Sequence, residues 1–152
     1  MRSFGSTRSL IGAVLAAVFL LAGCVGTPGV RDPQSFTPTE VGSLAHLSFP
    51  EGTVLVSTTF QAFEDWHLTA ILTFPADAVD QFATDNALVL SDEERPVRDD
   101  ARPDDPTWTP DASTNVLSYD GSADPISGVY RRLLLDLDDP ETVTLYLVAF
   151  TT

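Results

Sequence analysis

Apolar and polar side chains alternate along two neighbouring stretches of the chain. Residues 53–60 are rich in β-branched side chains, and residues 66–74 place an apolar side chain at every second position. A period of two puts successive side chains on opposite faces of a β-strand, so one face of each strand is expected to be buried. The five residues between the two stretches are few enough for a hairpin. We therefore expect an antiparallel pair of strands here.

The period changes after Pro75, where residues 76–87 follow the spacing of a helix. Val79, Phe82 and Ala83 fall on one stripe, and acidic residues lie in the first turn, where the helix dipole favours negative charge. We place Pro75 at the first helical position and expect the helix to end near Asp85 or Asn86. The apolar stripe is expected to pack on the sheet.

Three further strands are predicted in the C-terminal third, at residues 115–119, 129–137 and 142–150. Asp120 and Gly121 are a turn signal after the first of them, and residues 138–141 are short enough to close a hairpin between the other two. The final strand is apolar on both faces, which is typical of a central strand. We expect the helix to cover one of those faces.

Two segments show no period. Residues 25–40 are rich in Gly, Pro, Thr and Ser and predict a flexible tether, so the globular domain is expected to begin near Val41. Residues 91–114 contain four prolines and many acidic residues, and they predict a long exposed loop because proline blocks regular strand pairing.

The predicted fold class is α+β, with a small antiparallel sheet of about five strands and one helix packed on one face. It forms a single domain over residues 41–152, preceded by a cleaved signal peptide (residues 1–23) and the tether (residues 24–40).

The signal peptide is expected from the first 24 residues. Arg2 and Arg8 precede an apolar stretch over residues 10–21. As a helix this stretch would rise about 18 Å, well short of the roughly 30 Å hydrocarbon core of a membrane. It is therefore typical of a secretion signal and not of a transmembrane span.

The stretch ends in Leu21, Ala22, Gly23 and Cys24. This motif resembles the lipobox of bacterial lipoproteins, with a preferred residue at each position. The resemblance implies that Cys24 takes a thioether-linked diacylglycerol, that Leu21, Ala22 and Gly23 are recognised by the signal peptidase, and that cleavage follows Gly23. The alternative is an ordinary secretion signal with an incidental cysteine. The rest of the chain is loosely similar to short lipoproteins of actinobacteria, which implies a class and a location and no activity.

Cys24 is the only cysteine among the 152 residues. A spare thiol is a liability in the oxidising compartments that receive exported proteins, so one cysteine placed at the lipobox agrees with lipidation. Two acyl chains are sufficient for stable anchoring. We therefore expect a protein held by its lipid on the extracytoplasmic face of the cell membrane.

Acidic residues dominate the charge. The chain has 8 Arg, no Lys and 22 Asp plus Glu, and without residues 1–23 six Arg remain, for a formal net charge of −16. Nucleic acid is excluded as a partner, because affinity for it comes mainly from Lys and Arg that displace counterions. The expected partners are the membrane, through the lipid, and an envelope protein or a cell-wall component.

Residue patterns typical of catalysis or metal binding are sparse. His46 and His67 are the only histidines, and neither has a partner at the spacing of a zinc site. The GxSxG, P-loop and GxGxxG motifs are absent, so we expect no cofactor. His67 lies on the polar side of its strand and is a candidate general base or ligand contact. The alternative, which we favour for both histidines, is an exposed side chain without a chemical role.

The acidic loop is a candidate calcium site. Its Asp99, Asp100, Asp104, Asp105 and Asp111 supply the oxygen ligands that Ca²⁺ prefers. The loop lacks the ligand spacing and central glycine of an EF-hand, so a solvated loop without a metal is favoured.

Trp108 and two adjacent arginines are weaker candidates. Trp108 offers a stacking surface to a sugar or peptidoglycan fragment, or else it anchors its loop to the domain, which we favour. Arg131 and Arg132 are suited to an anionic ligand, or they pair with the nearby Asp136 or Asp138, which we also favour.

We predict a non-enzymatic binding or interaction domain. The alternatives are an envelope hydrolase that uses a pair of carboxylates and a calcium-binding surface module. A pocket with two buried carboxylates would favour the hydrolase. A transporter subunit is ranked last, because it would normally need a larger, two-lobed ligand-binding body.

Overall fold

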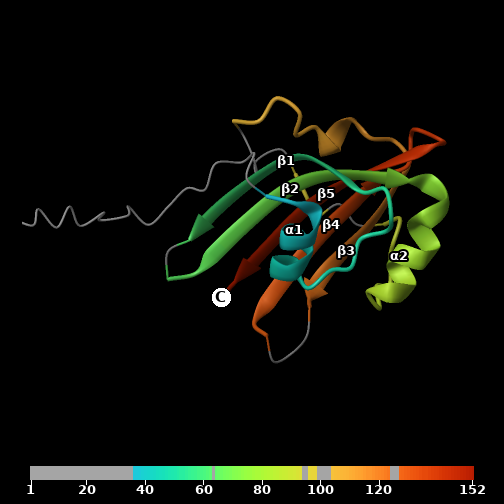
Figure 1. Cartoon of the computed structure of the whole chain (residues 1–152). Coiled ribbons are helices and arrows are strands. Elements are labelled where there is room, and N and C mark those ends of the chain that lie inside the picture. The colour runs from blue at the N-terminus through green and yellow to red at the C-terminus, as the bar shows by residue number, and fades with distance from the viewer. Residues whose placement is uncertain (1–35, 63, 94–95, 99–103, 124–126) are drawn as a thin grey trace, which may run out of the picture.

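The computed structural model describes residues 36–152 except 63, 94–95, 99–103 and 124–126 (Figure 1). The predicted signal peptide, the lipobox and most of the tether therefore lie outside the described residues, as do Asp99 and Asp100 of the acidic loop. Among the residues that are described, no helix is both long and apolar enough to cross a bilayer.

The domain is built on one open antiparallel sheet, as the alternation predicted. Its strands are β1 (Val54–Ala62), β2 (Trp66–Pro75), β3 (Val116–Ser122), β4 (Val129–Asp136) and β5 (Thr142–Thr151). Their order in the sheet is β1-β2-β5-β4-β3. The C-terminal strand is thus central, which agrees with its apolar residues on both faces.

The predicted turn at Asp120 and Gly121 is wrong. Both residues belong to β3, where they pair with Arg132 and Arg131 of β4. A glycine fits here because a Cβ on Gly121 would lie only 2.8 Å from the hydroxyl oxygen of Tyr119. Pairing with β4 thus keeps these two residues in a strand, although their sequence is typical of a turn.

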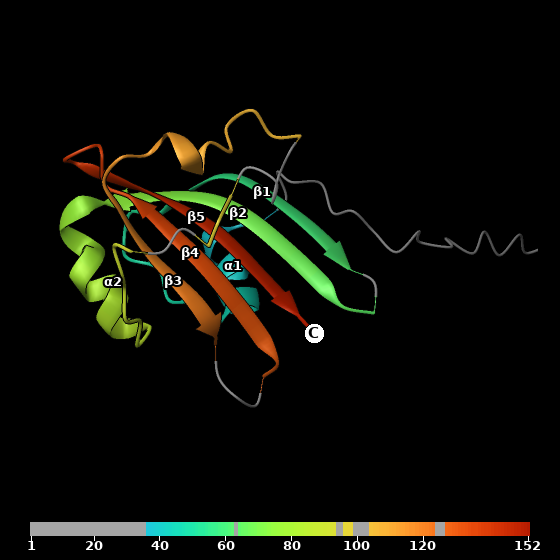
Figure 2. The same ribbon diagram turned by 180° about the vertical axis from the view of Figure 1, so that it is seen from behind.

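The first face of the sheet carries the larger core. Its buried side chains come from alternate positions of the three inner strands, among them Leu72 of β2, Leu133 of β4 and Leu147 of β5. The helix α1 (Pro38–Ala45) covers this face and contacts β2, β4 and β5. Figure 1 shows α1 in front of the sheet, and Figure 2 shows it behind.

Helix α1 corrects the predicted tether, because the ordered chain begins before Val41. Thr37 and Glu40 form a reciprocal capping box, in which each side chain accepts a hydrogen bond from the other residue's backbone N–H. Pro38 stands at the start of the helix, where its missing N–H is harmless. Phe36 is buried against Phe60 of β1, with ring centroids 5.8 Å apart. The composition of residues 36–40 suggested a linker, but their spacing specifies a helix start.

The predicted helix after β2 is present in two parts, η2 (Ala76–Ala78) and α2 (Val79–Asp85), and it ends at Asp85 with Asn86 as its C-cap, as expected. Pro75 closes β2 and precedes the helix, so its placement at the first helical position is wrong. Phe82 is buried, and its ring centroid lies 5.3 Å from that of Phe74. The helix lies at the end of the sheet where β2 finishes (Figure 1). Where a single helix was predicted to pack on the sheet, the structure thus has two among the described residues, this helix and α1.

The prediction of an exposed loop at residues 91–114, which we call the strap, is corrected in part: most of its described residues are exposed, but several are buried. Val97, Trp108 and Pro110 are buried, and the last begins a short helix, η4 (Pro110–Ala112). Val97 and Trp108 pack on Ile71, Leu134 and Tyr146, on the second face of the sheet. Proline prevents the strap from joining the sheet, but two large apolar side chains are enough to hold it over that face.

Candidate binding surface

Among the described residues, the strap covers the second face of the sheet at one end. At the other end, register pairs His67 of β2 with Phe150 of β5, and Phe150 with Tyr130 of β4. Directly paired residues of an antiparallel sheet share a face, so the three rings stand side by side across three strands. We call these three residues the ring row.

The rings are stacked on one another. The centroid of Phe150 lies 6.3 Å from that of His67 and 5.7 Å from that of Tyr130, and the interplanar angles are 22° and 17°. Tyr130 keeps 41% of its surface exposed, His67 is also exposed, and Phe150 between them is half-buried. The ring row is therefore an aromatic strip that solvent can reach.

A guanidinium group borders the ring row. Arg132 occupies the next row of the same face, with its Cζ 5.4 Å from the centre of the Phe150 ring. Its Nε lies 3.6 Å from a carboxylate oxygen of Asp120, and both side chains are nearly half exposed. This ion pair is thus a surface pair of small energetic value, so Arg132 can be recruited by a ligand at little cost.

The environment lowers the pKa of His67 below its usual 6.5. The larger cause is burial, because the partly covered ring loses water, and the second is the positive charge of Arg132. The uncharged form of the imidazole is thereby favoured, and this form presents one N–H donor and one acceptor nitrogen beside the apolar rings. An arrangement of this kind can hold a ligand by ring contact and hydrogen bonds.

Arg131 does not belong to this surface. It lies on the first face, only 3% exposed, and its guanidinium donates a 2.8 Å hydrogen bond to the carbonyl oxygen of His46 and lies 5.6 Å from the centre of the Tyr119 ring. His46 caps the C-terminus of α1 in the left-handed conformation. Arg131 therefore holds the helix end, where positive charge is favoured by the dipole. The predicted pairing of the arginines with Asp136 or Asp138 is wrong, because Arg132 meets Asp120.

Trp108 is the anchor of the strap, which was the favoured interpretation. Its side chain is 3% exposed, and its indole N–H donates a 2.8 Å hydrogen bond to the carbonyl oxygen of Arg98. The ring stands edge-on to Tyr146, with centroids 5.3 Å apart. A ring enclosed in this way offers no stacking surface to a ligand.

The acidic residues of the strap that the structure describes do not converge on one point. Among the described residues, which include Asp104, Asp105 and Asp111, no group of three or more His, Cys, Asp or Glu side chains lies close enough to hold a metal ion. Asp105 instead accepts hydrogen bonds from the hydroxyl of Ser57 and the backbone N–H of Thr107. Its role is to fix the strap to β1.

Comparison with known proteins found no match. Protein-family models, curated proteins and solved structures were all searched, and none resembles the chain. The interpretation of this surface consequently depends on its residues and their geometry.

Sequence reasoning named His67 and Arg132 as candidates, although it favoured a role without a ligand for both, and it did not name Tyr130 or Phe150. A signal was present, because the alternation of residues 129–137 places Tyr130 and Arg132 on one face of their strand. Phe150 could not be added from sequence, since only the β2–β5 and β4–β5 registers bring it between the other two rings.

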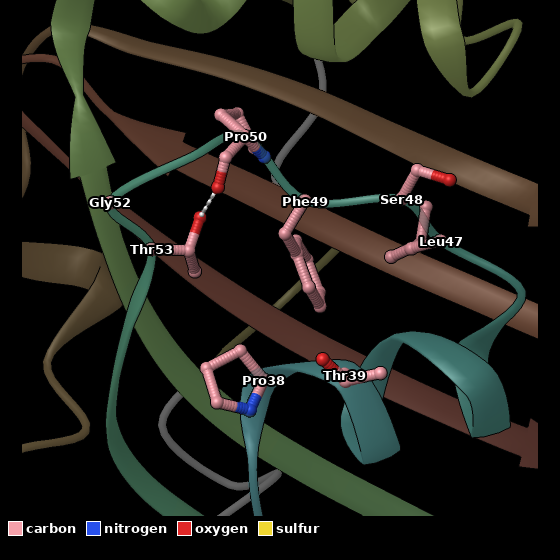
Figure 3. A pocket seen from close by; sticks show the side chains of 8 residues that line it. All are labelled: Pro38, Thr39, Leu47, Ser48, Phe49, Pro50, Gly52 and Thr53. Atoms are coloured by element: carbon pink, nitrogen blue, oxygen red, sulfur yellow. Dashed lines mark hydrogen bonds between the residues drawn. The ribbon is translucent and has the colours of Figure 1, made fainter.

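A pocket lies on the opposite side of the domain, between α1 and the extended segment that follows it. It has a volume of about 490 Å³ and is lined by Pro38, Thr39, Leu47, Ser48, Phe49, Pro50, Gly52 and Thr53. Figure 3 shows the Phe49 ring pointing from this segment toward the helix. The lining contains no carboxylate, so the pocket does not supply the paired acids that a hydrolase of the expected type would need.

Proposed function

We propose that the protein is a lipid-anchored extracytoplasmic lipoprotein whose domain binds an envelope protein or a cell-wall component without catalysing a reaction. The observation that carries the anchoring is the lipobox-like motif Leu21-Ala22-Gly23-Cys24, which holds the only cysteine of the chain. Two acyl chains on Cys24 would hold the domain on the membrane, and its acidic surface would be repelled by anionic headgroups. The domain is thereby free to meet partners in the envelope.

The anchoring is tested by the variant Cys24→Ser. A serine oxygen does not take the thioether-linked lipid, so we expect the variant to leave the membrane fraction and the wild type to remain there. The measurement is immunoblotting of membrane and soluble fractions, together with the mass of the mature N-terminus. Thr27→Ser is the control, since it keeps the thiol and changes a neighbouring residue. A Cys24→Ser protein that still sediments with membranes, although the mass of its N-terminus shows that residues 1–23 have been removed, refutes the anchoring.

The ring row supports the binding role. Exposed aromatic residues beside an arginine are the side chains that most often carry binding energy at protein interfaces. Tyr130 is the most exposed of the three rings, with 41% of its surface open, so it is the natural first target.

The binding role is tested by cross-linking from native membranes followed by purification of the complexes. We expect Tyr130→Ser to lose at least one cross-linked species, because it removes a contact ring without disturbing the core. Val89→Ser is the matched control: Val89 is 85% exposed and lies away from the ring row, after α2. Equal cross-linking of the wild type and both variants would rule out the ring row as the contact surface.

A further inference from the structure

The outer edge of β1 is an open strand edge. In the described part of the chain, β1 pairs with β2 alone, and its other side has no strand neighbour. The opposite edge of the sheet is different, because Ser91 of the strap forms a two-way backbone bridge with Ser118 of β3. An edge strand presents alternate N–H and C=O groups outward, ready to pair with another extended chain.

The sequence of β1 does little to prevent such pairing. The nine residues Val54–Ala62 include no charged side chain, although the domain around them is strongly acidic. Val54 and Val56 are 58% and 52% exposed, and they are two of the four large apolar side chains that the described surface exposes most. Natural edge strands are usually protected by Lys, Pro or inward charges, and β1 has only the irregular register between Leu55 and Ser57.

Acidic side chains stand at both ends of this uncharged edge. Glu51 precedes β1, and Glu64 and Asp65 follow it, all three exposed. A second copy of the chain paired antiparallel would bring Glu51 of one copy toward Glu64 and Asp65 of the other, which is unfavourable. A segment with basic residues at both ends would meet opposite charge instead.

We propose that the outer edge of β1 binds an extended segment of a partner protein as a sixth strand, with an apolar centre and basic residues at both ends. Main-chain hydrogen bonds would supply affinity, Val54 and Val56 would contact the apolar centre, and the flanking acids would set the preference for basic ends. This surface is separate from the ring row, so the inference does not depend on it.

The probe is a synthetic peptide of sequence RTVTVTVR, compared with ETVTVTVE and with RTVPVTVR. The protein as it is produced in the cell, purified in detergent micelles, is titrated with each peptide, and hydrogen exchange of the β1 amides is followed. We expect the first peptide to bind and to protect Val54–Ala62. The second is expected to bind more weakly because its ends are repelled, and the third because proline lacks a backbone donor.

Two double variants, each compared with a control variant, separate the contribution of charge from that of apolar contact. Glu64→Gln with Asp65→Asn should weaken binding of RTVTVTVR by about three- to tenfold, whereas Asp92→Asn with Asp111→Asn, the same charge change on the strap, should leave it unchanged. Val54→Ser with Val56→Ser should weaken binding, and Val89→Ser should not. None of these side chains is buried, so the variants are expected to fold.

The proposal is overturned by any of three results. The first is equal binding of the Arg- and Glu-flanked peptides. The second is protection outside β1 in their presence. The third is self-association of the protein that Val54→Ser with Val56→Ser abolishes, which would make a second copy the occupant of the edge. Loss of membrane anchoring in Cys24→Ser bears on none of these outcomes, so the two proposals can fail separately.

Discussion

At the scale of single residues, Trp108 does the most to decide the fold of its segment. The strap around it is acidic and proline-rich, yet the indole lies against Tyr146 and donates its N–H to the Arg98 carbonyl. The free energy gained by burying this large ring, with its N–H hydrogen-bonded, outweighs the preference of the surrounding polar residues for solvent.

We predict that Trp108→Ala destabilises the domain by about 3–5 kcal/mol, because it opens a cavity under the strap and leaves a carbonyl without its donor. Urea unfolding measures the change. The control Val89→Ala removes an apolar side chain that is 85% exposed and should change stability by no more than about 0.5 kcal/mol. An equal effect of both substitutions would show that the strap does not depend on its tryptophan.

His67 predicts a pH dependence of stability. Its pKa in the folded domain lies below 6.5, first because of burial and second because of Arg132, so the unfolded chain binds a proton more readily than the folded one. Stability from this group is therefore complete above about pH 6.5 and falls as the pH drops through the folded pKa.

We expect His67→Gln to flatten that part of the stability profile. The free energy of unfolding, measured by urea titration between pH 7.5 and 5.5, should fall less in the variant than in the wild type. All the other ionisable side chains are common to both proteins, so the comparison isolates the contribution of His67. Parallel profiles would mean that the imidazole is as easily protonated in the folded domain as in the unfolded chain.

At the scale of elements, α1 shows how a short helix depends on its end. Eight residues are too few for a helix to be stable alone, so α1 relies on its capping box and on Arg131 at the His46 end. The helix covers the first face of the sheet, and weakening its start is expected to weaken that cover.

We predict that Thr37→Ala costs about 0.5–2 kcal/mol of stability, because the N–H of Glu40 loses its acceptor. Thermal or urea unfolding gives the measurement. Thr39→Ala is the matched control: the same change inside the helix, at an exposed position, should be neutral or slightly stabilising through the higher helix propensity of alanine. The capping role is refuted if the two variants unfold at the same denaturant concentration.

The elements themselves were largely predictable. The strands at residues 53–60, 66–74, 129–137 and 142–150 and the helix after Pro75 follow from periodicity, which is a property of neighbouring residues. Two of the errors arose where composition was taken as the guide. Residues 36–40 were assigned to a tether although they contain a capping box, and the strap was assigned to solvent although it contains Val97 and Trp108.

At the scale of the whole molecule, the candidate surface was predictable only in part. His67 and Arg132 were singled out by residue type, but the ring row needs Tyr130 and Phe150 as well. It also needs the strap to stop short of that end of the second face. Both conditions are set by strand order and by packing between distant segments, which no local pattern reports.

Periodicity alone determined that the chain forms an antiparallel sheet with a helix after its second strand. The reason is that backbone geometry fixes the directions in which the side chains of neighbouring residues point. Residue type and position alone placed the lipobox-like motif and the single cysteine. The tertiary structure decided which strand is central, which face the strap covers, that Arg131 and Arg132 lie on opposite faces, and that the outer edge of β1 has no strand neighbour among the described residues. These features depend on contacts between residues far apart in the chain. Such contacts stabilise the protein only when the whole domain is assembled.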